Sequence, residues 1–175
     1  MIVAISVAVV VIVIGVLTLA ATKSNTISIR RETTIDAPPA KVFAIIDDFH
    51  NWKSWAPQDV EDATMTRSFS GASAGKGAVS EWDSTKSAGK GRMEITEVVP
   101  LRAVTVVVDF QRPLVAHNVN RFELEPAGSS THVTWIMHGT NPYIAKVMSL
   151  FVNMDSVLGK HFESGLANLK AAAER

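Results

Sequence analysis

The chain contains no cysteine among its 175 residues. Disulfide bonds, catalytic thiolates and cysteine-ligated zinc sites are therefore excluded, although this absence does not indicate a cellular compartment. An excess of charge of either sign is also missing, because 17 Lys and Arg balance 17 Asp and Glu. A protein that follows a nucleic-acid backbone usually presents a basic surface, so we expect no nucleic-acid partner.

Motifs of several enzyme classes are missing as well. The sequence has no His-Glu-x-x-His or His-x-x-x-His pair, so we expect no metal site and no cofactor. It has no Gly-x-Ser-x-Gly nucleophile elbow, and spacing alone identifies no nucleophile beside a base. The sequence therefore assigns no catalytic residue, and it leaves enzymatic activity open while favouring a protein without it.

Two copies of Ser-Ala-Gly-Lys-Gly, at residues 73–77 and 87–91, look at first like phosphate-binding loops. A P-loop needs Gly-x-x-x-x-Gly-Lys followed by Ser or Thr and then a helix, whereas strand patterns follow both copies here. Glycine tolerates the positive φ angles of tight hairpin connections. We therefore predict two hairpin turns, of which the first could also border a cavity mouth and act as a lid.

One long hydrophobic run occupies the N-terminus. Residues 2–21 carry no charged side chain, and twenty helical residues span about 30 Å, the thickness of the hydrocarbon core of a bilayer. A cleaved signal peptide is the alternative, but such peptides usually begin with a basic segment and have a shorter apolar core. We predict a single transmembrane anchor over residues 1–22, a linker at 23–25 and one domain over 26–175.

The charges next to this run bear on the side of the membrane. Lys23, Arg30 and Arg31 follow it, and no Lys or Arg precedes it. Positively charged flanks tend to remain in the cytoplasm, so the cytoplasmic side is slightly favoured for the domain, and the extracytoplasmic side stays open. The sequence does not indicate an oligomeric state.

The residues after the linker follow patterns of an α+β domain. Residues 26–35 place isoleucines in the alternating register of a strand. A helix over 40–49 follows a pair of prolines, and residues 50–57 form a short helical turn. Turn residues then separate further strands, as in an antiparallel meander. These strands are predicted at 62–70, 77–84, 91–99, 102–110, 117–125 and 131–139.

A single long amphipathic helix is predicted to close the chain. Asn141 supplies an N-cap and Pro142 a first helical residue, and apolar residues then recur at three- and four-residue spacing. Gly159 and Gly165 each weaken a helix by about 1 kcal/mol relative to alanine. Close packing often offsets this loss, so we expect Gly159 to face the sheet or a cavity.

Two segments are specific enough to indicate a family. The domain begins with TIDAPPAKVFAIIDDFHNWKSWAP and ends with NPYIAKVMSLFVNMDSVLGKHFESGLANLK. Over residues 26–172 the chain resembles the START/Bet v 1-like superfamily, also called SRPBCC, and within it the membrane-anchored subgroup of polyketide cyclase and lipid-transport proteins. The resemblance implies a helix-grip fold, in which about seven antiparallel strands curve around the C-terminal helix and enclose an apolar cavity. It implies a hydrophobic ligand and no shared catalytic motif.

Aromatic and methionine side chains are candidates for the wall of that cavity, because ligand pockets are mainly apolar. The same side chains are equally compatible with an ordinary core. Asp109, Asn118 and Asn120 are candidates for orienting a ligand, and the alternative is that they are solvated at strand ends. The predicted ligand-binding residues are Trp55, Phe69, Trp82, Met93, Phe110, Asn118, Asn120, Trp135, Met137, Met148, Phe151, Met154 and Leu158.

These observations favour a membrane-tethered module that binds or transports a hydrophobic small molecule such as a lipid, an isoprenoid or a polyketide. The alternative is a polyketide cyclase or dehydratase-like enzyme, in which an inward carboxylate such as Glu81, Asp83 or Asp109 acts as a general base. A third hypothesis is a partner-binding or chaperone-like module without a cavity, which would need an exposed apolar patch.

Overall fold

The computed structural model describes residues 2–62, 64–86 and 88–175, without the side chains of residues 2–4, 58 and 61. The helices in this part of the chain are α1 (Ile2–Ala21), α2 (Pro39–Ile46), the 3-10 helix η1 (Phe49–Ser54), α3 (Pro57–Glu61), α4 (Tyr143–Met148) and α5 (Met154–Ala173). The strands are β1 (Thr26–Ile35), β2 (Thr66–Gly71), β3 (Ala78–Asp83), β4 (Lys90–Val99), β5 (Ala103–Arg112), β6 (Ala116–Ala127) and β7 (Ser130–Thr140).

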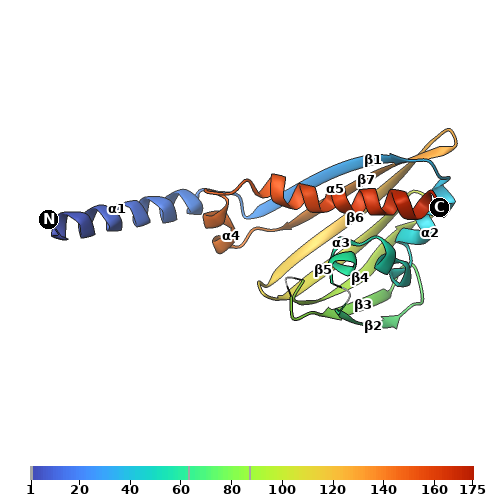
Figure 1. Ribbon diagram of the computed structural model, residues 1–175, viewed down its shortest axis with the longest axis horizontal. Coiled ribbons are helices and arrows are strands. Elements are labelled where there is room, and N and C mark those ends of the chain that lie inside the picture. The colour runs from blue at the N-terminus through green and yellow to red at the C-terminus, as the bar shows by residue number, and fades with distance from the viewer. Residues whose placement is uncertain (1, 63, 87) are drawn as a thin grey trace.

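The strands form one antiparallel sheet in the order β1-β7-β6-β5-β4-β3-β2. Strands β2 to β7 are a meander, as predicted, and β1 returns to pair with β7 from Thr26↔Thr140 to Ile35↔Thr131. Helix α5 runs along one face of the sheet, with α2, η1 and α3 on the same side (Figure 1). The predicted α+β class, with seven antiparallel strands and a C-terminal helix, is confirmed.

The predicted single closing helix is instead two helices. Asn153 begins α5, because its side chain accepts a hydrogen bond from the backbone N–H of Ser156 at 3.1 Å. This local cap interrupts an apolar pattern that continues across the break between α4 and α5. Asn141 does not cap α4 either, since its Nδ2 donates to the carbonyl of Ser24 and the N-cap residue is Pro142.

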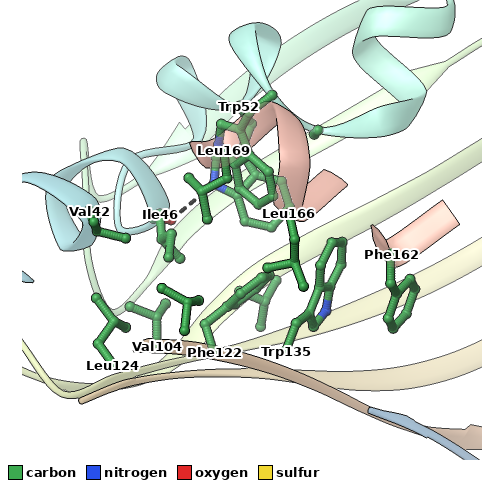
Figure 2. Packing of buried hydrophobic residues seen from close by; sticks show 14 of the residues in the cluster. Val42, Ile46, Trp52, Val104, Phe122, Leu124, Trp135, Phe162, Leu166 and Leu169 are labelled. Atoms are coloured by element: carbon green, nitrogen blue, oxygen red, sulfur yellow. Dashed lines mark hydrogen bonds between the residues drawn. The ribbon is translucent and has the colours of Figure 1, made fainter. Parts of the chain in front are cut away.

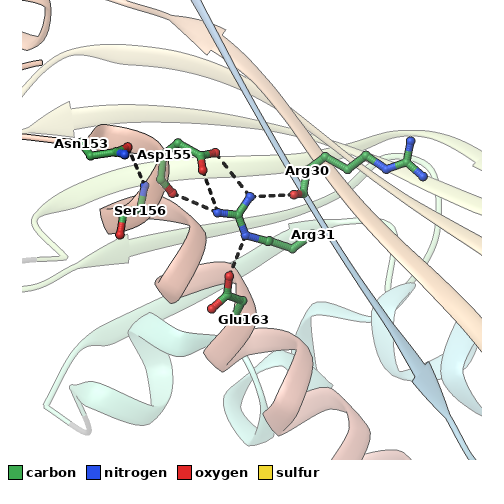
Figure 3. Close-up of polar contacts among 6 residues, drawn as sticks. All are labelled: Arg30, Arg31, Asn153, Asp155, Ser156 and Glu163. Atoms are coloured by element: carbon green, nitrogen blue, oxygen red, sulfur yellow. Dashed lines mark hydrogen bonds and ion pairs between the residues drawn. The ribbon is translucent and has the colours of Figure 1, made fainter.

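Arg31 of β1 fastens the first turns of α5 to the sheet (Figure 3). Its Nε donates to Glu163 Oε1 at 2.7 Å, and one terminal nitrogen donates to the carboxylate and the main-chain carbonyl of Asp155. Hydrogen bonds to Asp155 and Glu163 raise the pKa of Arg31 above its ordinary value. Gly159 faces this guanidinium, and a Cβ there would collide with it. Gly159 therefore faces the sheet, as expected.

The hydrophobic core lies where α2, η1 and the second half of α5 cover the sheet (Figure 2). Its centre is aromatic. Trp55 is fully buried, with its ring about 6 Å from those of Phe122 and Trp135, and Trp135 stacks on Phe162 with 4.2 Å between ring centroids. Trp52 is anchored by a hydrogen bond from Nε1 to the carbonyl of Ile46 at 2.9 Å.

The first Ser-Ala-Gly-Lys-Gly copy forms the turn between β2 and β3, as predicted. Gly75 and Gly77 have positive φ angles of 69° and 89°. The backbone N–H of Gly75 donates to the carbonyl of Asp47 at 2.8 Å, so this turn packs against the end of α2. None of residues 73–77 lines the cavity described below, and the expectation of a lid at this turn is not met.

The second copy connects β3 to β4, and its first residue, Ser87, lies outside the described residues. Gly89 has a positive φ of 60°, and its carbonyl accepts a hydrogen bond from the backbone N–H of Ser84, which closes the turn. Lys90 and Gly91 already belong to β4. This second turn borders the cavity described below, because Ala88 belongs to the cavity lining.

Helix α1 coincides with the N-terminal apolar run and projects from the rest of the chain beside α4 (Figure 1). The hydroxyl of Tyr143 in α4 donates to the carbonyl of Leu17 at 2.6 Å. From Ile5 onward the side chains of α1 are mostly exposed. Among the described residues, no helix combines the length and the apolarity that a membrane crossing requires. The predicted transmembrane helix is therefore not confirmed.

Candidate ligand-binding cavity

A cavity of about 690 Å³ lies between the sheet and α5. This volume is within the range of small-molecule sites. All seven strands contribute to its wall, mainly through side chains of one face, because alternate residues of a strand point to the same side. The lining residues are Ile27, Trp52, Ala56, Asp62, Arg67, Trp82, Lys86, Ala88, Met93, Val108, Phe110, Pro113, Leu114, Ala116, Asn118, Asn120, Trp135, Met137, Thr140, Asn141, Pro142, Ala145, Met154, Val157, Leu158, His161 and Phe162.

Most of the predicted ligand-binding residues are brought together here. Strand register explains several of them, since Asn120 of β6 pairs with Met137 of β7, and Asn118 lies two residues earlier on the same face. Whether these residues contact a ligand stays a prediction. The predicted residues that line the cavity are Trp82, Met93, Phe110, Asn118, Asn120, Trp135, Met137, Met154 and Leu158.

Four predicted residues lie elsewhere. Trp55 is fully buried in the aromatic core behind the cavity wall. Phe69 on β2 is 42% exposed and stacks on His50. Met148 and Phe151, which are 47% and 73% exposed, fall at the end of α4 and in the connection after it. The prediction assumed one continuous helix, and the break before α5 turns these two side chains away from the cavity.

Asn118 and Asn120 are the two polar residues that β6 contributes to the cavity lining. Asn120 is buried, and its Oδ1 accepts a hydrogen bond from Trp135 Nε1 at 2.9 Å. The indole N–H of Trp135 therefore has a hydrogen-bond partner within the cavity wall. Asn118 occupies space that Gly139 leaves free on the neighbouring strand, where a Cβ would collide with the amide. Asp109 does not point inward: it is half exposed and bonds to His117 Nδ1 at 2.6 Å.

Charged residues occur in one part of the lining, and the sequence patterns gave no reason to single them out. Asp62 follows α3, Arg67 lies on β2 and Lys86 lies in the connection from β3 to β4. Arg67 forms a bidentate ion pair with Asp59, whose side chain is buried. This cluster brings together segments that are distant along the chain, so no local sequence motif predicts it.

Asp62 is the carboxylate that reaches the cavity, and its environment keeps it ionised. Hydrogen bonds from the hydroxyls of Ser84, at 2.5 Å, and Thr64, at 2.6 Å, hold the pKa of Asp62 well below its usual range. Lys86 Nζ lies 3.3 Å from Asp62 Oδ1. A carboxylate stabilised in this way is a poor general base near neutral pH, because it has little tendency to accept a proton.

The carboxylates that the enzyme hypothesis named are not in the lining. Glu81 is exposed on β3. Asp83 forms ion pairs with Arg112, at 2.6 Å, and with Lys90, at 3.3 Å. The cavity can therefore enclose an apolar molecule and offer it a few hydrogen-bonding groups, whereas none of the predicted bases borders it.

Comparison with known proteins identifies the family. The family model described as "Polyketide cyclase / dehydrase and lipid transport" matches residues 26–174. The chain belongs to this family. The predicted relation to the START/Bet v 1-like superfamily is thereby confirmed, and the sheet with its C-terminal helix is the helix-grip arrangement. No curated protein matches the sequence.

Solved structures share the fold of this polyketide cyclase and lipid-transport domain. Protein CV1439 from Chromobacterium violaceum is 18% identical with a TM-score of 0.62, over 86% of this chain and 98% of that one. A protein from Rhizobium leguminosarum is 15% identical with a TM-score of 0.61, over 86% and 95%. Ara h 8.0201 is 13% identical with a TM-score of 0.57, over 85% and 97%. At such identities the likeness establishes the fold alone.

Proposed function

We propose that the domain binds a hydrophobic small molecule, such as a lipid, an isoprenoid or a polyketide, in the cavity between the sheet and α5. The single observation that carries this proposal is a cavity of about 690 Å³ whose wall is mainly aromatic, aliphatic and methionine side chains. Apolar surface that leaves water for such a wall stabilises a complex by roughly 25 cal/mol per Å². Membership of a family described by lipid transport supports the same reading.

We further propose that α1 holds the domain at a membrane. The support is the row of apolar side chains that α1 exposes, including Ile5, Val9 and Ile12. Two apolar side chains of the cavity lining, Leu114 and Val157, also remain about half exposed. A poorly soluble ligand would then have little water to cross between a bilayer and the cavity. The cytoplasmic side remains a prediction.

The enzyme alternative has less support. It needs an inward carboxylate or histidine with a perturbed pKa beside the cavity that can act as a base. The carboxylate of the lining, Asp62, has a lowered pKa, which makes it a poor general base near neutral pH. The partner-binding alternative without a cavity is disfavoured by the volume between sheet and helix. The binding module is therefore the function that the geometry favours.

Ligand capture tests the proposal. The full chain, purified in a mild non-ionic detergent from a lipid-containing host, would be extracted with organic solvent and its extract measured by mass spectrometry. We expect a stoichiometric apolar compound. Leu158→Trp, which fills the cavity, should abolish its recovery. Val99→Trp, at a position outside the lining, is the matched control and should retain it. A folded protein without any compound, also after incubation with lipid extract, would contradict the proposal.

Membrane attachment is tested separately. We expect the full chain to sediment with membranes and to be released by detergent but not by carbonate at high pH. The double variant V9K/V13K places charges on the apolar surface of α1 and should move the protein to the supernatant. Sedimentation that is unchanged in this variant would disprove tethering through α1 and leave ligand binding untouched.

A further inference from the structure

In the charged part of the cavity lining, Arg67 and Lys86 each form an ion pair with a carboxylate. Arg67 is only 12% exposed, and its guanidinium binds both carboxylate oxygens of Asp59 and the hydroxyl of Ser80, at 2.8 Å. Because the side chain of Asp59 is 4% exposed, this pair is largely withdrawn from solvent. A buried cation that is fully paired has little capacity left for an anionic ligand.

Asp62 and Lys86 form the second pair, and here the two partners differ. The side chain of Asp62 is 4% exposed and is fixed by Ser84 and Thr64, whereas that of Lys86 is 57% exposed. The negative charge is therefore a permanent part of the wall. The positive charge rests on a flexible side chain that Asp62 holds near the cavity.

From this arrangement we propose that Asp62 is a specificity-determining residue, which makes the cavity prefer uncharged amphiphiles to anionic ones by neutralising Lys86. The inference rests on the proposed function, since it concerns the ligand of the same cavity. An anionic head group entering this region would meet the fixed charge of Asp62, and the neighbouring cations already have partners. Transfer of an unpaired charge from water is costly, whereas a hydroxyl needs only one hydrogen bond.

The chemical class that fits is thus a long apolar molecule with a neutral polar end, such as an alcohol. The polar end would lie near Asp62 and Lys86, and the apolar chain would extend along Trp82, Met93 and Phe110. Each of the charged side chains keeps its partner in such a complex. A free carboxylate or a phosphate monoester would have to displace Asp62 from Lys86.

A competition between two ligands of equal length tests this inference. The full chain would be immobilised in non-ionic detergent at pH 8 and incubated with equal amounts of hexadecanol and hexadecanoate. The retained ratio would be measured by mass spectrometry after extraction. Asp83→Asn is the matched control, because it removes one carboxylate from β3 outside the cavity.

We expect the unchanged chain and Asp83→Asn to retain the alcohol in excess. Asp62→Asn should shift the ratio about tenfold towards hexadecanoate, which corresponds to about 1.4 kcal/mol. Lys86→Gln should shift the ratio in the opposite direction. Since Lys86 is exposed, this variant should fold even if Asp62→Asn does not. If the ratio in Lys86→Gln is unchanged or moves towards hexadecanoate, the proposed role of Asp62 is overturned. Retention of both ligands in the same experiment would still support binding in the cavity. Failure to retain either compound would overturn this inference, whereas the proposed function is overturned only if the chain also takes up no compound from a lipid extract.

Discussion

Gly165 and Gly159 lie on the same helix but face neighbours of different stiffness. A Cβ on Gly165 would lie 2.8 Å from a ring carbon of Trp135 and 3.0 Å from the ring of Pro57, and neither ring can move without disturbing the core. A Cβ on Gly159 would meet the end of Arg31, which is a flexible side chain. The loss of stability caused by a Cβ at either position therefore depends on the side chain that it meets and not on the helix.

We predict that Gly165→Ala lowers the free energy of unfolding by about 1–3 kcal/mol through overpacking. Gly159→Ala should change it by less than about 1 kcal/mol, because the helix propensity of alanine offsets the displaced guanidinium. Urea denaturation followed by circular dichroism measures both. Equal effects of the two substitutions would contradict the assignment of a rigid neighbour at Gly165.

Asp47 ends α2 with a carboxylate in an unfavourable place. Burial, with a smaller contribution from the charge of Asp48, raises the pKa of Asp47. Among the described residues, its Oδ1 has no hydrogen-bond partner. A negative charge at a helix C-terminus is also opposed by the helix dipole.

We predict that Asp47→Asn raises the free energy of unfolding at pH 7, by less than about 1 kcal/mol. The sign follows from linkage. A carboxyl with a raised pKa binds its proton more readily in the folded state, so its ionisation disfavours folding as pH rises through that pKa. The gain should vanish near pH 3, where Asp47 is protonated in both states. Urea titrations at both pH values measure it, and a loss of stability at pH 7 would contradict it.

At the scale of the element, α5 depends on different contacts along its length. From Phe162 onward it packs through Phe162, Leu166 and Leu169 into the hydrophobic core. Its first turns carry the cavity residues Met154 and Leu158 and are tied to β1 through Arg31. The first turns, which border the cavity, are thus held to β1 by polar contacts, which are weaker where they are exposed.

We predict that Arg31→Met accelerates amide hydrogen exchange in the first two turns of α5 while lowering global stability by no more than about 1 kcal/mol, because Asp155 and Glu163 are more than half exposed. The matched control is Arg30→Met on the same strand, since Arg30 pairs only with nearby Glu32 among the ion pairs described. Hydrogen exchange with mass spectrometry distinguishes the two. Equal exchange in both variants would show that Arg31 does not fasten the helix.

At the scale of the whole molecule, the cavity separates the sheet from part of its covering helix. A protein with an unfilled apolar cavity gives up contacts that a ligand can restore. Binding to the folded state alone adds about 2.7 kcal/mol of stability at a ligand concentration of one hundred times Kd.

We predict that adding hexadecanol to delipidated full chain raises the thermal midpoint by several degrees, in the range of 2–4 °C per kcal/mol expected for about this chain length. Leu158→Trp, which fills the space, should show no such rise. Differential scanning fluorimetry measures both proteins in the same detergent. A rise of equal size in Leu158→Trp would place the ligand outside the cavity.

The fold could be predicted largely from local signals. Alternation in residues 26–35 and 131–139, and turn residues between the strands, gave the meander within a few residues of the observed bounds. The closing helix was predicted at the right place but as one continuous helix. The apolar spacing continues across Asn153, so the N-cap that this residue forms for α5 was not recognised. The predicted membrane-spanning helix is also not confirmed by the structure.

The candidate site was predictable where strand phase decides which way a side chain points. Asn118, Asn120 and Met137 follow from alternation on β6 and β7. Phe69 did not follow, because β2 is the edge strand and its side chain stacks on His50 outside the cavity. Asp62 was missed because its partners come from other segments and nothing next to it in sequence marks it.

From the sequence alone, periodicity and short-range turn chemistry predicted most of the strands and helices in their order along the chain, because both act between residues that are close in sequence. The family and its apolar cavity followed from the resemblance of two segments to known proteins. Tertiary structure decided which side chains border the cavity and which charges face it. Two ion pairs join residues that are far apart along the chain, Asp62 with Lys86 and Arg31 with Asp155 of α5. Such contacts arise from close approach of packed elements, and no local pattern encodes them.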